Sequence, residues 1–147
     1  MSRLAAVLLA GGAGALVGMQ APVNARLGKG LGSLQAATFS FIVGTVALLV
    51  AASIAQGGLG SFRHTGGIPW WAFIGGLLGA TYVTVAILTV RTLGATGLTA
   101  AVITGQLVIS VAIDRFGLLG IARQPLALHR VVGLVLLVAG VALVVRR

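Results

Sequence analysis

Long apolar runs without a charged residue follow one another along the chain, separated by short polar or basic stretches. A bilayer core about 30 Å thick requires about 20 apolar residues in a helix, so such runs are candidate membrane spans. The pattern predicts an all-α membrane protein with five transmembrane helices, at approximately residues 4–25, 34–55, 69–90, 93–113 and 130–146. The last span is short, but Arg side chains at both of its ends can extend to the membrane surface. A four-span arrangement, with the first or last segment lying in the interface, is the alternative.

The connections between the predicted spans are brief, and the longest cover residues 56–69 and 114–130. None is long enough to hold a soluble domain, so residues 1–147 are expected to form a single transmembrane domain. Residues 26–32 are expected to form a Gly-rich, basic connection. Residues 91–95 leave room for little more than a turn, which predicts a tight antiparallel hairpin between the third and fourth spans.

The composition argues against a soluble globular protein. Hydrophobic residues make up 59% of the chain, which has only ten Lys/Arg and one acidic residue, whereas about 25% of the residues in soluble domains are charged. The positive charges are scattered between apolar runs and build no basic face, so nucleic acid is not an expected partner. Cys is absent and His is rare, so neither a metal site nor a cofactor is predicted. Membrane lipids are the expected surroundings.

The positive charges divide equally between the two sides of a five-span arrangement. One side carries Arg3, Arg63, Arg115, Arg123 and Arg130. The other side carries Arg26, Lys29, Arg91, Arg146 and Arg147. The positive-inside rule therefore predicts no preferred orientation. Either a local signal decides the orientation, or the chain inserts both ways and assembles as an antiparallel homodimer, which is the interpretation we favour.

Polar side chains inside the predicted spans recur on single helix faces. They are Gln20 and Asn24 in the first span; Gln35, Thr38 and Thr45 in the second, with Ser40 beside them; Trp71, Tyr82 and Thr89 in the third; and Thr99, Gln106, Ser110 and Asp114 in the fourth. Polar groups in lipid cost free energy unless they find a partner or water. One such stripe alone favours interhelical hydrogen bonding, whereas four together favour a shared polar cavity near the bundle axis.

Asp114 is the only acidic residue. It is either a helix-end carboxylate paired with Arg115 or Arg91, or a proton or cation site coupled to transport. No paired carboxylates, activated nucleophile or phosphate-binding loop is visible, so no enzymatic activity is predicted. The candidate residues of a substrate pathway are Gln20, Asn24, Ser40, Tyr82, Gln106 and Ser110, with Asp114 near its mouth.

Short motifs distributed over nearly the whole chain resemble those of a known family. They are GMQAPVN at 18–24, TFSFIVG at 38–44, Trp71 with GGLLGATY at 75–82, GQ at 105–106, DRFG at 114–117, and Arg130 with Gly133. In these motifs the chain is similar to the YdcZ-type small inner-membrane proteins of the drug/metabolite transporter superfamily.

The resemblance implies a five-helix half-transporter in a bacterial inner membrane, with members that pair as homodimers, heteromeric pairs or fused duplicates, often antiparallel. It also implies secondary transport of a small metabolite or drug-like solute by alternating access. The related small multidrug resistance proteins rely on a Glu in the first helix, and the first span here has no acidic residue. A neutral or weakly charged solute is therefore expected. A dual-topology ion channel and a non-transporting membrane scaffold are the alternatives.

Overall fold

The computed structural model describes residues 1–55, 60, 66–125 and 127–145. It divides into two compact units, Met1–Thr89 and Val90–Arg147, which are described separately. Every regular element among the described residues is a helix, which confirms the predicted all-α class. Most of the predicted second connection, including Arg63, and the end of the last predicted span lie outside the described residues.

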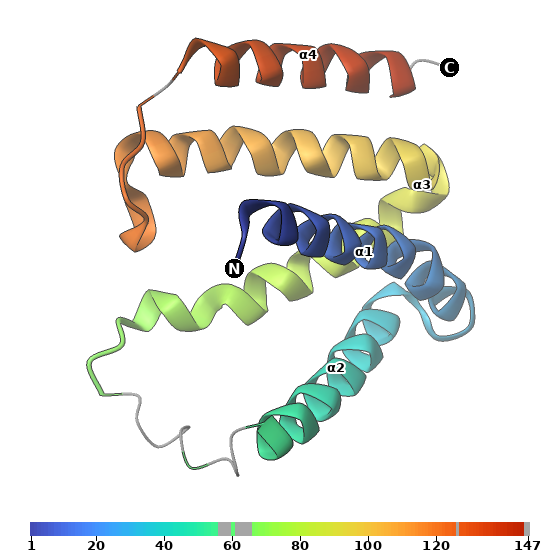
Figure 1. The fold of residues 1–147 in the computed structure, drawn as a ribbon. Helices are drawn as coiled ribbons and strands as arrows, with labels where there is room; N and C mark the ends of the chain where they lie inside the picture. The colour runs from blue at the N-terminus through green and yellow to red at the C-terminus, as the bar shows by residue number, and fades with distance from the viewer. Residues whose placement is uncertain (56–59, 61–65, 126, 146–147) are drawn as a thin grey trace. The chain divides into compact units, whose positions relative to one another are not determined.

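The first unit begins with two long helices, α1 (Arg3–Leu31) and α2 (Ser33–Ala55), joined at Gly32 (Figure 1). The hydroxyl of Ser2 caps α1 by accepting a hydrogen bond from the N–H of Ala5, at 3.2 Å. Gly32 has a φ of 92°, a backbone conformation that is open mainly to glycine and that ends the helix.

The predicted connection over residues 26–32 is wrong, because α1 continues through it to Leu31. Two residues in this last part of α1 explain why the helix persists. Leu27 packs against the core of the first unit, and Gly28 allows close approach of the neighbouring helices. Tertiary packing therefore stabilises helix beyond the point at which the charge-free run ends.

The core of the first unit is small and joins α1, α2 and the beginning of α3 (Gly75–Phe116). Its buried residues are Ala36, Ala37, Val83 and Ile87, with Leu27, Phe41 and Tyr82 packed against them. The alanines of α2 let the branched side chains of α3 approach its backbone, which is how membrane helices gain packing contacts where no hydrophobic effect drives them together.

The helix α3 follows a short 3₁₀ turn, η2 (Trp70–Ile74), which begins immediately after Pro69. Within α3, Gly94 has φ 71° and ψ 169° and interrupts the helical conformation. This break falls inside the turn predicted at residues 91–95. The boundary between the two units lies just before it, so the antiparallel hairpin of the third and fourth spans stays a prediction.

The second unit contains the rest of α3, the short turn η3 (Leu118–Gly120) and α4 (Leu128–Val145). The helix α4 begins two positions before the predicted start of the last span. The connection folds back onto the end of α3, because the N–H of Gln124 donates to the carbonyl of Asp114 at 2.8 Å and Nε of Arg123 donates to the carbonyl of Arg115 at 3.1 Å.

Within the described part of the chain, three helical stretches are long and apolar enough to cross a membrane: Arg3–Leu31, Ser33–Ala55 and Trp70–Phe116. Apolar side chains along them face outward; Leu48 in α2, for example, is 72% exposed. The third stretch has 47 residues, about twice the length that one crossing requires. A shorter apolar helix covers Arg130–Val144.

Candidate functional site

A buried hydrogen bond links α1 to α2 in the first unit. Asn24 is only 5% exposed, and the hydroxyl of Ser40 donates to its Oδ1 at 2.5 Å. The contact is part-buried and joins residues sixteen positions apart. Because an unpartnered amide in an apolar environment costs free energy, this bond stabilises the pairing of the two helices.

The other polar atom of the same side chain has no partner. Asn24 Nδ2 is buried and makes no hydrogen bond within the described part of the chain. The 2.5 Å contact with Ser40 lies in the range of an O–H···O bond and below that of an N–H···O bond. The geometry therefore assigns the carbonyl oxygen of the amide to Ser40 and leaves the amide N–H₂ as an unsatisfied donor.

A narrow crevice surrounds this donor. It is lined from α1 by Gln20, Ala21 and Asn24, and from α3 by Tyr82, Val83 and Ala86. Gln20 and Asn24 share a helix face because they are four residues apart, and Pro22 between them removes the main-chain donor that would otherwise bond to the carbonyl of Gly18. Three helices thus contribute polar groups to one place, with Ser40 supplied by α2.

The crevice is narrow and electrically neutral. It has no room for a water-sized sphere. None of its lining residues carries a formal charge. The site offers amide and hydroxyl groups between small apolar walls, which suits hydrogen bonding to an uncharged solute rather than acid–base or metal chemistry.

The structure brings four of the candidate residues together: Gln20, Asn24, Ser40 and Tyr82. Gln35, Thr38 and Thr45, the stripe predicted for the second span, do not line this crevice. Sequence reasoning missed the apolar wall of Ala21, Val83 and Ala86. The available signal was spacing, because Ala86 lies four positions after Tyr82 and shares its helix face.

The remaining candidate residues belong to the second unit. Gln106 and Ser110 are exposed on α3, at the four-residue spacing that places them on one helix face. Neither lines the apolar groove that this unit forms between α3 and α4.

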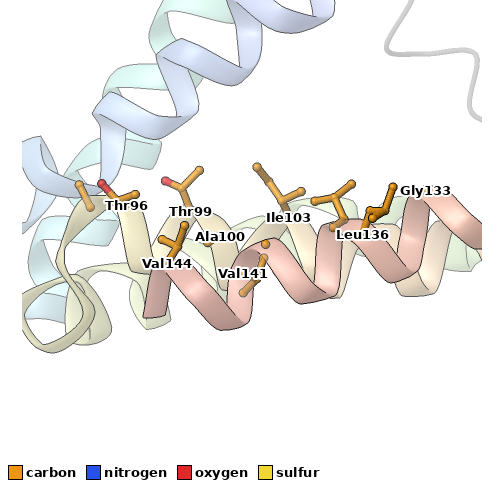
Figure 2. A pocket seen from close by; sticks show the side chains of 11 residues that line it. Thr96, Thr99, Ala100, Ile103, Gly133, Leu136, Val141 and Val144 are labelled. Atoms are coloured by element: carbon orange, nitrogen blue, oxygen red, sulfur yellow. The ribbon is translucent and has the colours of Figure 1, made fainter. Parts of the chain in front are cut away.

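That groove is open and about 800 Å³ in volume. Figure 2 shows the labelled side chains that line it, with the hydroxyl groups of Thr96 and Thr99 near one end and Gly133 and Leu136 near the other. Of the polar stripe predicted for the fourth span, only Thr99 contributes to this groove.

Asp114 forms an ion pair with Arg130, whose Nη1 donates to Oδ2 at 3.2 Å. The pairing partner therefore comes from α4, rather than being the neighbouring Arg115 that was considered from the sequence. Nη2 of Arg130 also donates to Oε1 of Gln124. Both charged side chains are more than a third exposed, so the pair fixes the connection between α3 and α4 but contributes little free energy.

Comparison with known proteins finds a match, to a protein family, that covers nearly the whole chain. No curated protein and no solved structure matches it. A family model described as "Putative inner membrane exporter, YdcZ" matches residues 5–143, which agrees with the motifs from the first span to the last. That family is named for export across a membrane and not for an enzymatic reaction. Because the match covers nearly the whole sequence, the chain belongs to the YdcZ family of inner-membrane proteins.

Proposed function

We propose that the chain is a half-transporter that moves a small uncharged or weakly charged solute across the inner membrane of a bacterium by alternating access. The observation that carries the proposal is the meeting of Asn24, Ser40 and the Gln20–Tyr82 crevice in an otherwise apolar bundle. Polar groups inside a membrane protein are costly and mark solute pathways more often than they mark lipid-facing surface.

The proposed working unit is a dual-topology homodimer of five-span protomers. The break at Gly94 would let α3 supply two crossings, and α4 would supply the last. Two such chains in opposite orientations reproduce the inverted repeats of larger transporters. The solute would lie near the membrane midplane between the protomers, and rocking of the two halves would expose it to each side in turn.

In this proposal the narrow crevice is one state of the pathway, and separation of α1 from α3 would open it. Gln106, Ser110 and Asp114 of the second unit are proposed to take part in transport as well. For the first unit, the proposal is supported by the contacts and the shared crevice of its candidate residues. For the second unit, it is supported only by the common helix face of Gln106 and Ser110.

The proposal is tested by flux. Proteoliposomes loaded with a mixture of uncharged polar metabolites should release at least one of them faster than protein-free liposomes, at a rate that saturates with concentration. Gln106→Leu should abolish this flux while leaving the dimer folded; unchanged flux would remove Gln106 from the pathway. Mass spectrometry of the external solution gives the rate.

Two results would overturn the proposal in different directions. Flux that never saturates and far exceeds about 1000 molecules per second would identify a channel. Release equal to that from protein-free liposomes for every solute would identify a scaffold, in which the polar groups only hold helices together.

A further inference from the structure

Asn24 Nδ2 is a hydrogen-bond donor at the boundary of the crevice, and none of the described residues accepts a hydrogen bond from it. The surrounding side chains explain why it cannot simply turn to another group. Its Oδ1 is held by Ser40, and because the amide is planar, that bond also fixes the direction of Nδ2. Packing at 5% exposure restricts the side chain further.

Leaving a buried donor unsatisfied costs free energy that a ligand can recover. A solute that presents an acceptor oxygen to Nδ2 forms a hydrogen bond with this donor. A solute that presents only donors leaves Nδ2 unpaired and places a second donor beside it. A site built around an unpaired polar group therefore discriminates against solutes of the wrong hydrogen-bonding type more strongly than against solutes of the wrong size.

We infer that, once separation of α1 from α3 opens the crevice, Asn24 makes it selective for uncharged solutes that carry a hydrogen-bond acceptor, such as a carbonyl oxygen, which binds to Nδ2 while Ser40 holds Oδ1. This inference rests on the proposed function for the identity of the site as a solute pathway. It adds the chemical class of the ligand and the atom that recognises it. Tyr82 and the apolar walls would contact the rest of the solute.

The chain offers a direct probe of this atom, because Asn24 is its only asparagine. Selective ¹⁵N labelling of asparagine therefore gives one pair of side-chain N–H₂ signals in an NMR spectrum of the protein in nanodiscs, and both belong to Asn24. Three small molecules with the same ring serve as ligands: cyclohexanone, which only accepts; methylenecyclohexane, which has the same shape but neither accepts nor donates; and cyclohexylammonium, which only donates.

Cyclohexanone should shift the Asn24 amide resonances saturably, with an apparent dissociation constant at least about tenfold lower than that of methylenecyclohexane, since one satisfied buried N–H is worth about that ratio. Methylenecyclohexane controls for partitioning into lipid. Equal shifts with the two molecules, or no shift with cyclohexanone, would overturn the inference. A saturable shift with cyclohexylammonium alone would also overturn it, and would mean that the amide presents its oxygen to the crevice.

Two variants extend the test. Asn24→Leu removes the donor and keeps a side chain of similar size, so the thermal stabilisation by cyclohexanone should be lost. Ser53→Ala, a change of an exposed hydroxyl elsewhere on α2, should leave the response to cyclohexanone unchanged. If Asn24→Leu does not fold, the wild-type comparison of cyclohexanone with methylenecyclohexane still decides.

Failure of this inference and failure of the proposed function give different results. If the protein transports a solute in proteoliposomes but the Asn24 amide does not distinguish the three molecules, the proposed transport function stands and the inferred selectivity for acceptors is wrong. If the amide prefers cyclohexanone but no solute crosses the membrane, the inferred binding site stands and the proposed transport function is wrong.

Discussion

Asn24 and Ser40 lie sixteen positions apart in the sequence, so no local spacing rule connects them before the helices that carry them are paired. The four-residue spacing of Gln20 and Asn24 predicted a common face, and the crevice confirms that both line one place. The spacing did not indicate that Ser40 would bond to Asn24, nor that one amide atom would be left over. Both facts depend on how α2 is positioned along α1 when the two helices pack together.

At the scale of the residue, we predict that Ser40→Ala destabilises the protein by about 1–3 kcal/mol, because the buried Oδ1 of Asn24 loses its donor. The matched control is Ser53→Ala. Ser53 is on the same helix but is exposed, and its hydroxyl donates to the carbonyl of Leu49 at 2.8 Å. That change should alter stability by no more than about 0.5 kcal/mol. Reversible unfolding in mixed micelles measures the free energy of unfolding of both variants. Equal losses of stability would contradict the proposed contribution of the Asn24–Ser40 hydrogen bond.

At the scale of the element, the position of Gly28 decides how closely α1 approaches its neighbours. A Cβ added there would lie 3.2 Å from Cγ2 of Ile87 in α3 and 3.7 Å from Cβ of Ala36 in α2. The charge pattern predicted a connection at residues 26–32, because the first charge-free apolar run ends there. The helix continues because packing of its last turn against α2 and α3 outweighs that local signal.

We therefore predict that Gly28→Leu destabilises the first unit by about 1–3 kcal/mol through overpacking against Ile87 and Ala36. Gly30→Leu is the control, because an added Cβ at Gly30 meets nothing within 4 Å. There the better helix propensity of Leu should leave stability unchanged or raise it by up to about 1 kcal/mol. Thermal denaturation of the two variants side by side gives the comparison; similar losses in both would show that the close approach at Gly28 is not limiting.

At the scale of the whole molecule, the balance of positive charge motivates the proposed antiparallel pair. Five Lys/Arg are expected on each side of a five-span chain, so neither orientation is favoured by the positive-inside rule. The helical content and the family match support an inner-membrane protein with several apolar helices. The orientation and the pairing belong to the proposal.

Reporter fusions at both termini should give cytoplasmic signal at each end, because a dual-topology chain inserts both ways. Two single substitutions provide opposite controls. Arg3→Ala removes a charge from one side and Lys29→Ala removes one from the other, so they should bias the orientation in opposite directions. A wild-type chain with cytoplasmic signal at one end only, or two variants that shift the same way, would refute the dual-topology proposal.

The sequence by itself determined the class of this protein: helical, embedded in a membrane, with polar stripes on the faces of several spans. It could do so because a bilayer demands long apolar helices with satisfied backbone hydrogen bonds, and length and periodicity are local properties of a chain. The break at Gly94 was also readable, since the turn at residues 91–95 interrupts two apolar runs.

Only the tertiary structure decided which polar groups find one another. It paired Ser40 with Asn24, left Asn24 Nδ2 unsatisfied, joined Asp114 to Arg130 and carried α1 on to Leu31. Helical periodicity assigns a residue to a face but does not say which helix covers that face or at what height. Hydrogen bonds and close contacts form over a few ångströms, so their partners are set by the packing of helices against one another.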